Sequence, residues 1–395
     1  MFSLFIFNVL IKIILYERNY IKTVFISIEK MKRSIFLLVV ILFISCGNNS
    51  QQQSNSDIEI DKIQLNDDCF DEIKTGLIDS IRILKLNENE KSYFVSISKL
   101  IVHNDTLYVF DHFGRDLLMS FDRNGNYITT FSQKGGGPQE YVRLWDFDVD
   151  SKYVYLYDRA KQKMLYYDHT GNFVKSHSTS FRGDAFVVLQ NNEYLFSLAK
   201  ENKNHKLCMT DSTLTITKTL LSYQKEDIDD RMTDNLFQRV NNTIYYNKVV
   251  NDSVYAFSNQ GNMQKCYYFN FNNKNVPDDE KHSYDKLVSS KGKEKYVYFN
   301  DCPMILNNFI IGSVFQNGNK GTFLYDTEKD KGGIKEWRAH KIELSDIILP
   351  ITTTQNCVIG WMDYSVYEAL SDKSMFSSEL TQHLNDGGHV LVFTI

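Results

Sequence analysis

The clearest repeat in the sequence begins with LYVFD at residues 107–111, followed by FDRNGNYI at 121–128. The pattern returns as VYLYD at 154–158 and YDHTGNFV at 167–174, so the copies are offset by 46 or 47 residues. Each copy has an apolar strand ending in Asp, a second strand ending in an aromatic residue and Asp, and a Gly-Asn turn. We expect Gly125 and Gly171 to supply the positive φ of a tight hairpin. A period of about 40 to 50 residues made only of strands is typical of β-propeller blades.

Weaker copies raise the number of units to six. They pair 193–196 with 208–211, 243–246 with 254–257, 309–312 with 322–326, and 357–361 with 390–393. A propeller joins its first and last blades because an unpaired edge would otherwise stay exposed. Residues 80–86 precede the first unit, and we expect them to form the outer strand of the last blade. The sequence therefore predicts an all-β fold over residues 76–395, a six-bladed β-propeller whose N-terminal strand closes the last blade.

An export signal precedes the repeats at residues 31–46. Lys32 and Arg33 give a basic start, residues 35–44 are apolar, and Ser45 stands before Cys46. This order is typical of a secretory signal peptide, and the apolar run is about half the ~20 residues that a membrane-spanning helix needs. We interpret residues 1–30 as an over-extended start. Residues 47–75 are expected to be a flexible tether, because they begin with a run of Asn, Gln and Ser.

The end of this signal, LFISC at 42–46, resembles a bacterial lipobox. The resemblance implies that the thiol of Cys46 is acylated and anchors the chain to a membrane. The alternative is an ordinary signal peptide with a coincidental cysteine. We expect a cell-envelope protein, lipid-anchored at the outer membrane and facing the periplasm, with surface exposure left open.

Composition narrows the classes of partner and cofactor. The net charge of −5 gives no electrostatic support for nucleic-acid binding, so we expect no nucleic-acid partner. The cysteines after residue 46 are widely spaced and include no CxxC pair, which argues against a disulfide framework and a zinc site. We interpret them as small core residues: Cys69, Cys208, Cys266, Cys302 and Cys357. We expect a monomer with no cofactor and no metal.

A glycine-rich run, KGGGPQEY at 134–141, lies between the first two repeats. With the lipobox and the repeats, it makes the chain resemble the six-bladed β-propeller lipoproteins common in Bacteroidetes, which are related to NHL-repeat proteins. In that family a Gly-x-Gly-Pro-x-Glu-Tyr loop links the first two blades, and the matching residues here are Gly135, Gly137, Pro138, Glu140 and Tyr141. The resemblance covers roughly residues 76–395. It implies the fold and an envelope location, but no activity.

Two local motifs have a chemical and a structural interpretation. The glycine-rich run lacks the Lys-Ser/Thr and the following helix of a phosphate-binding loop, so we interpret it as a turn in which Glu140 accepts backbone hydrogen bonds. Residues 122–126 alternate oxygen-bearing side chains as a calcium loop does, but Gly125 stands between the ligand positions instead of after them, and no glutamate lies at the required distance. We interpret them as a hairpin turn.

Ligand-binding residues of a propeller are expected on its innermost strands. These strands should lie around residues 96–102, 142–149, 181–188, 237–240, 296–300 and 351–354. Their polar residues are our candidates for lining a central funnel: Arg143, Trp145, Arg182, Asp184, Arg239, Tyr298 and Asn300. Arginine beside aromatic residues suits carboxylate, phosphate or sugar ligands. The alternative is that these residues form blade-to-blade salt bridges and packing contacts.

The sequence contains no HExxH and no Gly-x-Ser-x-Gly motif, and catalytic residues remain unknown. Our leading hypothesis is a non-enzymatic envelope lipoprotein whose propeller binds a glycan, a peptide or another envelope protein. The alternatives are an envelope hydrolase or lyase with a site in the funnel, and a sensor or assembly subunit. Segments 224–235, 272–295 and 366–388 interrupt the repeats as surface excursions, and the last is expected to contain a short helix from Ser377 to Leu384.

Overall fold

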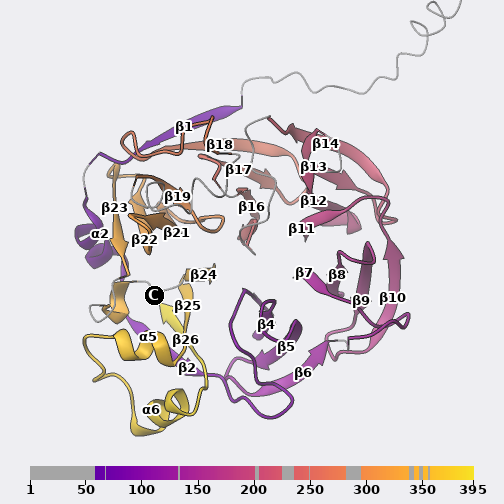
Figure 1. Cartoon of the computed structure of the whole chain (residues 1–395), viewed down its shortest axis with the longest axis horizontal. Coiled ribbons are helices and arrows are strands. Elements are labelled where there is room, and N and C mark those ends of the chain that lie inside the picture. The colour runs from indigo at the N-terminus through magenta and orange to yellow at the C-terminus, as the bar shows by residue number, and fades with distance from the viewer. Residues whose placement is uncertain are drawn as a thin grey trace, which may run out of the picture. The chain divides into compact units, whose positions relative to one another are not determined.

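The computed structural model describes residues 58–395, apart from 67, 132–133, 201–203, 225–234, 249, 282–294, 338–341, 347–349 and 355. The signal, Cys46 and most of the excursions at 224–235 and 272–295 therefore lie outside the described residues. Within residues 58–395, six small sheets are arranged around a ring as a six-bladed β-propeller (Figure 1). The predicted fold is confirmed.

The blades follow one another along the chain. Blade 1 contains β3 (Lys99–His103), β4 (Thr106–Asp111), β5 (Leu117–Asp122) and β6 (Tyr127–Phe131). Blade 2 contains β7 (Leu144–Val149), β8 (Val154–Asp158), β9 (Lys163–Tyr167) and β10 (Phe173–Ser178). Blade 3 contains β11 (Gly183–Val188), β12 (Tyr194–Leu198), β13 (His205–Thr210) and β14 (Ile216–Ser222).

The second half of the ring departs more from the simple four-strand pattern. Blade 4 contains β15 (Phe237–Val240), β16 (Thr243–Tyr246), β17 (Ser253–Ser258), β18 (Met263–Asn270) and, at its outer edge, β1 (Glu59–Gln64). Blade 5 contains β19 (Val297–Phe299), β20 (Met304–Leu306), β21 (Phe309–Gln316), β22 (Asn319–Asp326) and β23 (Lys331–Glu336). Blade 6 contains β24 (Pro350–Thr353), β25 (Val358–Met362), β26 (Val390–Thr394) and β2 (Ile81–Lys85).

The Asp that ends the second strand of a repeat ties that strand to the segment just before the inner strand of the same blade. In blade 1, Asp111 Oδ2 accepts a hydrogen bond from the backbone N–H of Val95 at 2.9 Å. In blade 2, Asp158 Oδ2 accepts one from Val142 at 2.7 Å. Each carboxylate also accepts a backbone N–H of the loop that follows it. Because both oxygens of each carboxylate accept backbone hydrogen bonds, the repeated Asp is a structural residue.

A second Asp shapes the outer hairpin of each repeat. Asp122 and Asp168 each accept the backbone N–H of the Asn four residues later, at 2.8 and 2.9 Å. Gly125 and Gly171 have φ of +80° and +92°, as predicted. Hydrogen bonds from Asn172 and Thr170 lower the pKa of Asp168 to about 2. The carboxylates of Asp122 and Asp168 thus accept hydrogen bonds from their own turns, in agreement with the interpretation of residues 122–126 as a hairpin turn.

The hydrophobic core consists of clusters between neighbouring blades. One cluster joins blades 1 and 2, where the ring of Phe110 on β4 lies 5.8 Å from that of Phe147 on β7. Another joins blades 2 and 3, where Tyr157 on β8 lies 5.6 Å from Phe196 on β12. Such aromatic side chains each bury a large apolar area. Since these contacts come from the next blade, one repeat does not bury its apolar surface alone.

Closure of the ring agrees with the sequence prediction. Strand β2 pairs antiparallel with β26, with Ile81 opposite Thr394 and Lys85 opposite Val390. Blade 6 is therefore completed by residues that precede blade 1, and Figure 1 shows β2 and β26 side by side. The C-terminal insertion of this blade contains helices α5 (Tyr364–Ala369) and α6 (Ser378–Asn385). Helix α6 is capped by Ser377, which confirms the predicted helix.

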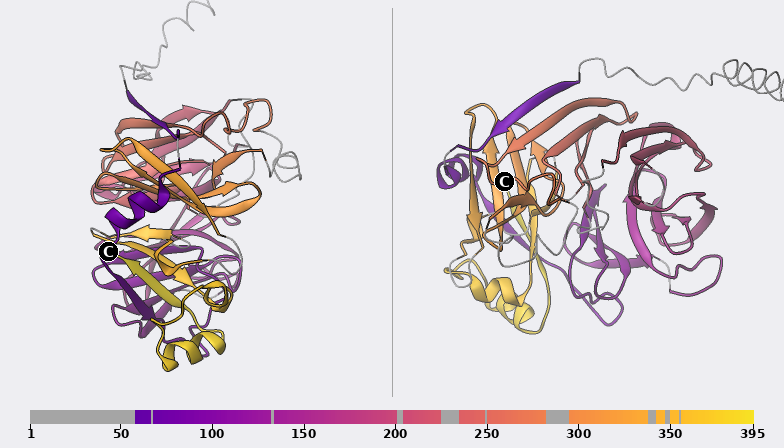
Figure 2. Two further views of the ribbon diagram at one scale, coloured as in Figure 1. Left: turned by 90° about the vertical axis from the view of Figure 1, so that its left-hand side faces the viewer. Right: turned by 45° about the horizontal axis from the view of Figure 1, so that its top comes forward.

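The expected tether over residues 47–75 does not extend that far. Residues 59–64 form β1, which pairs in parallel with β18, and residues 70–77 form helix α2 (Phe70–Leu77). Ile63 of β1 and Phe70 and Ile73 of α2 are buried in the cluster around blade 5. The chain thus covers the outside of blades 4 and 5 before it enters blade 6 as β2 (Figure 2). The propeller consequently starts before residue 76.

Blade 5 also differs from the expected innermost strand at 296–300. Its inner position is divided between two short strands. Strand β19 pairs with residues 314–316 of β21, and β20 pairs with residues 309–311. The pairing is interrupted between Phe299 and Met304, where Pro303 has no backbone N–H to donate to the ladder. Among the described residues, no helix is long and apolar enough to cross a membrane.

Candidate functional site

The inner strands β7 and β11 begin at the same end of the ring, which we call the top face. Here the guanidinium of Arg159, from the β8–β9 loop, lies 4.4 Å from the ring centroid of Trp145 on β7. Arg143, just before β7, lies 5.2 Å from the same ring. His112, from the β4–β5 loop, packs edge-on against Trp145 at 5.2 Å. Blades 1 and 2 thus place two arginines and a histidine around one tryptophan.

A buried carboxylate continues this cluster into blades 3 and 4. Asp184 on β11 is 1% exposed, and its Oδ1 lies 3.1 Å from the guanidinium of Arg159. Its Oδ2 lies 3.3 Å from Nζ of Lys248, which follows β16 and also contacts the hydroxyl of Tyr223. One carboxylate therefore faces two cations. We call Arg143, Trp145, Arg159, Asp184 and Lys248 the arginine site.

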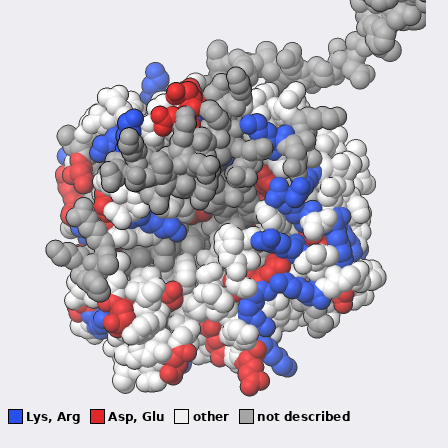
Figure 3. Space-filling view, viewed as in Figure 1, with Lys and Arg blue, Asp and Glu red and all other residues white. Residues whose placement is uncertain are grey.

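The exposed member of the arginine site is Arg143. Within the described ranges it forms no ion pair. Nearby, Nζ of Lys134 lies 3.3 Å from Asp116 Oδ2. Burial raises the pKa of Asp116, an effect that Lys134 and Arg143 oppose. Figure 3 shows Lys and Arg side chains gathered over the elements of blades 2 and 3.

The glycine-rich run at 134–141 supports this site from outside as a closed turn. The backbone N–H of Gly137 donates to Glu140 Oε2 at 2.7 Å, and a Cβ at Gly135 would overlap that same carboxylate. The hydroxyl of Tyr141 donates to the backbone oxygen of Asp116 at 2.7 Å. Lys161 donates to the carbonyl oxygens of Gly135 and Glu140. The geometry is that of a structural turn, since the carboxylate of Glu140 occupies the space beside the glycines.

The axis of the ring is filled by polar contacts between inner strands. Nζ of Lys99 on β3 lies 2.9 Å from Asp146 Oδ1 on β7, and Asp146 Oδ2 accepts the backbone N–H of Phe186 on β11 at 2.9 Å. Across the ring, the side-chain amide of Asn235 donates to the backbone oxygen of Ser98 at 2.9 Å. Blades 1 and 4 thus touch at this level, and the expected funnel is occupied by protein groups there.

Three of the predicted residues lie outside the arginine site. Arg239 on β15 donates to the backbone oxygen of Val188 at 2.6 Å and lies 3.4 Å from Asp148, near the opposite ends of β11 and β7. Tyr298 on β19 packs against Phe315 at 5.4 Å in a small separate cluster. Asn300 donates to Asp301 at 2.7 Å. Arg239 therefore forms the blade-to-blade contact that we kept as the alternative.

The structure thus brings together Arg143, Trp145 and Asp184, and half-buried Arg182 stands two residues before Asp184 in sequence. Sequence reasoning missed Arg159 and Lys248, because both come from loops after second strands. It also missed the inner-strand acids Asp146 and Asp148. Their signal was present: two acids alternate with apolar residues in LWDFDV, the segment expected to form an inner strand.

The bottom face holds a pair of stacked histidines. The rings of His103 and His169 are parallel within 5° and 5.9 Å apart, and Tyr108 hydroxyl lies 2.7 Å from Nδ1 of His169. Burial, followed by the neighbouring His169, lowers the pKa of His103. In the described part of the chain, no group of three or more His, Cys, Asp or Glu side chains is arranged to hold a metal.

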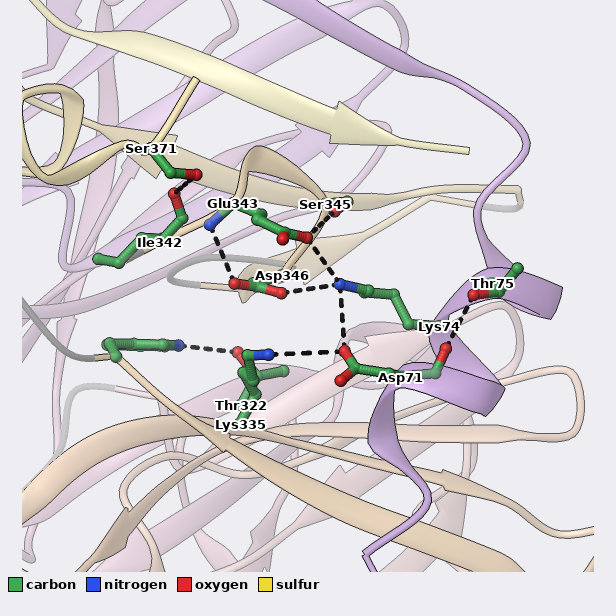
Figure 4. Close-up of polar contacts among 11 residues, drawn as sticks. Asp71, Lys74, Thr75, Thr322, Lys335, Ile342, Glu343, Ser345, Asp346 and Ser371 are labelled. Atoms are coloured by element: carbon green, nitrogen blue, oxygen red, sulfur yellow. Dashed lines mark hydrogen bonds and ion pairs between the residues drawn. The ribbon is translucent and has the colours of Figure 1, made fainter. Parts of the chain in front are cut away.

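A further group of charges fastens helix α2 to the ring (Figure 4). Nζ of Lys74 lies 2.9 Å from Asp346, 3.2 Å from Glu343 and 3.3 Å from Asp71. Burial alone would lower the pKa of Lys74, but Asp346 and Glu343 together raise it. Because the partners of Lys74 stand before blade 6 and on α2 itself, we assign this cluster a structural role.

The fold is similar to that of several solved structures. A protein of Bacteroides fragilis named as an exported protein is 16% identical, with a TM-score of 0.65 over 86% of this chain and 99% of that one. A DUF4221 family member from Bacteroides vulgatus is 11% identical, with a TM-score of 0.48 over 80% and 96%. Virginiamycin B lyase from Staphylococcus aureus is 10% identical, with a TM-score of 0.38 over 72% and 82%.

No curated protein matches the sequence significantly. A family match spans residues 56–386, which includes β1, helix α2 and all six blades up to the insertion before β26. Its first residue lies well before residue 76, in agreement with the earlier start of the folded part. The chain belongs to the family described as "Domain of unknown function (DUF4934)".

Proposed function

We propose that the chain is an exported, lipid-anchored envelope protein that binds a carboxylate-bearing partner through the arginine site and catalyses no reaction. The observation that carries the proposal is Arg143, an exposed guanidinium over Trp145 that forms no ion pair among the described residues. Arginine presents a planar set of donors that matches a carboxylate. Stacking on an aromatic ring restricts the guanidinium, so less entropy is lost when a ligand binds.

The neighbouring charges favour the same class of ligand. Asp184 is shared between Arg159 and Lys248, so two cations face one carboxylate. A carboxylate arriving from a partner would give Arg143 the ion pair that it lacks among the described residues. Clustered cations also raise the rate at which an anionic partner arrives.

Export and anchoring are supported by the sequence of residues 31–46. The basic start, the short apolar run and the LFISC end form the order that lipoprotein signals require. The structurally similar Bacteroides fragilis protein is named as an exported protein. Incorporation of a palmitate label into the chain, lost in Cys46→Ser, is the expected result, and equal labelling of both chains would contradict the anchor.

The binding test uses two carboxylate-bearing probes, poly-L-glutamate and polygalacturonate, with dextran as the neutral probe. Arg143→Gln should weaken binding of the acidic probes about tenfold or more, because a hydrogen bond to a charged group contributes about 1.5 kcal/mol or more. The matched control is Lys152→Gln, an exposed cation 5.0 Å from the ring of Tyr153 between β7 and β8. Equal weakening by both variants, or no binding of either acidic probe, would overturn the proposal.

A further inference from the structure

The arginine site continues into an exposed apolar area on the top face, and we propose that its partner is a protein segment in which acidic residues flank an apolar side chain. This inference rests on the proposed function and names the chemical class of its ligand. The area consists of Tyr93, Val95, Phe113 and Val142, which we call the apolar strip. Their exposed fractions are 51%, 60%, 73% and 52%. Large apolar side chains that stay more than half exposed on one face of a fold mark a candidate interaction surface.

Contacts hold the members of the apolar strip in blade 1 together. The guanidinium of Arg115 lies 3.9 Å from the ring centroid of Tyr93 and donates to its backbone oxygen at 2.9 Å. A Cβ at Gly114 would overlap Cβ of Val95, so the loop that carries Phe113 lies against Val95. Arg115, which does not belong to the arginine site, therefore lies against the apolar strip as a third arginine.

The path continues through His112. Its ring lies 4.7 Å from that of Phe113 and 5.2 Å from that of Trp145. The aromatic groups thus run without a break from blade 1 to the ring beneath Arg143 and Arg159. A ligand several residues long would reach both the apolar strip and the arginines.

The two valines are held outward by the repeat itself. Val95 and Val142 occupy equivalent positions in blades 1 and 2, since their N–H groups donate to the equivalent carboxylates of Asp111 and Asp158. These hydrogen bonds fix the backbone before each inner strand, and in both blades the side chain stays exposed. Exposure at both positions is therefore a property of the fold and gives the strip two aliphatic contacts in fixed places.

The aliphatic members of the apolar strip favour a peptide over a sugar. Sugars bind to proteins by stacking on open aromatic rings, and Arg115 covers one face of Tyr93 while Arg159 covers one face of Trp145. Valine offers no flat face for stacking. An apolar side chain of a peptide can pack against Val95 and Phe113, and its burial contributes about tenfold or more in affinity. The arginines select carboxylates on either side of it.

The test compares two peptides, acetyl-Glu-Glu-Phe-Glu-Glu-amide and acetyl-Glu-Glu-Ser-Glu-Glu-amide, by calorimetry on the intact protein. The Phe peptide should bind about tenfold more tightly. Phe113→Ser should remove this difference and leave the affinity for the Ser peptide unchanged. Arg143→Gln should weaken both peptides. The matched control is Ile128→Ser, an exposed apolar residue of β6 with 47% exposure, which should change neither affinity.

The outcomes separate the two proposals. If poly-L-glutamate binds but the two peptides have equal affinity, the apolar strip takes no part and this inference is overturned while the arginine site remains. Tighter binding of polygalacturonate than of the Phe peptide would also overturn it, in favour of an acidic glycan. Failure of every acidic probe would instead contradict the proposed function. Phe113 is 73% exposed, so its replacement leaves the core intact.

Discussion

The buried pair of Lys99 and Asp146 offers a quantitative test of how the inner strands are joined. Asp146 is fully buried, and Lys99 is 7% exposed and also donates to the backbone oxygen of Phe147 at 2.7 Å. Removing one partner leaves an uncompensated buried charge, which costs about 3 to 5 kcal/mol. We therefore expect Lys99→Met and Asp146→Asn each to lower the free energy of unfolding by about that amount.

The double variant should cost much less than the two single variants combined. With both charges removed, Asn at position 146 still offers an oxygen to the N–H of Phe186, and the remaining loss is about 1 to 3 kcal/mol for imperfectly paired polar groups. Urea unfolding measures each free energy from the midpoint at constant m-value. A matched control nearer the surface is Lys265→Met, whose partner Asp61 is partly exposed, with an expected change below about 1 kcal/mol. If the loss in the double variant equals the sum of the losses in the two single variants, the idea that Lys99 and Asp146 form a desolvated pair is refuted.

Three further predictions concern single groups. Gly125→Ala should destabilise the protein by at least about 1 kcal/mol, because φ is +80° and a Cβ would overlap the carbonyl oxygen of Lys85. In the control Gly136→Ala the new Cβ faces open space, so the free energy of unfolding should change by less than about 0.5 kcal/mol. The pKa of Asp168 is depressed to about 2, so the stabilisation that its carboxylate provides is complete above about pH 4 and is lost as the pH falls toward 2. The urea midpoint of the unchanged protein should therefore fall over this pH range, and that of Asp168→Asn should not; identical pH profiles of the two midpoints would contradict the prediction. Burial raises the pKa of Cys208 to about 12, so mass spectrometry should find it alkylated by iodoacetamide at pH 8 only after unfolding.

The repeat made most of the fold predictable. The Asp-ended strands and Gly-Asn turns recur because each makes the same local hydrogen bonds in its own repeat, as the equivalent contacts of Asp111 and Asp158 demonstrate. Closure by β2 followed from the physics of sheet edges, since β26 would otherwise end blade 6 with unpaired backbone groups. These features depend on contacts within one repeat or on a general rule, so the sequence was sufficient.

Strand β1 and helix α2 were missed because their partners are distant in sequence. Strand β1 reads EIDKIQ, in which only Ile63 is buried, and its place is fixed by a parallel pairing with β18, about 200 residues later. Helix α2 has eight residues, which is too short to form alone, so its packing against β22 and β23 stabilises it. Local composition resembles a tether in both cases, and tertiary contacts decide the structure.

Three of the candidate residues come together because the inner strands of blades 2 and 3 lie where the sequence predicts them, but positions along the inner strands were not predicted. Arg143 and Asp184 stand at the starts of β7 and β11, whereas Arg239 pairs with Asp148 and Val188 near the ends of those strands. A strand of six residues spans about 20 Å. Residues on neighbouring inner strands therefore fall into separate sites, and residue type alone does not assign them to one end.

The residues that sequence reasoning missed follow a rule that the repeat makes visible. His112 and Arg159 are equivalent, since each directly follows the Asp that ends a second strand. They approach the same ring of Trp145, His112 from blade 1 at 5.2 Å and Arg159 from its own blade 2 at 4.4 Å. Equivalent loops of adjacent blades thus meet around the inner-strand residue between them. Because the repeated Asp fixes the backbone there in both blades, the same position carries a histidine in blade 1 and an arginine in blade 2, and the two residues give the site different chemistry.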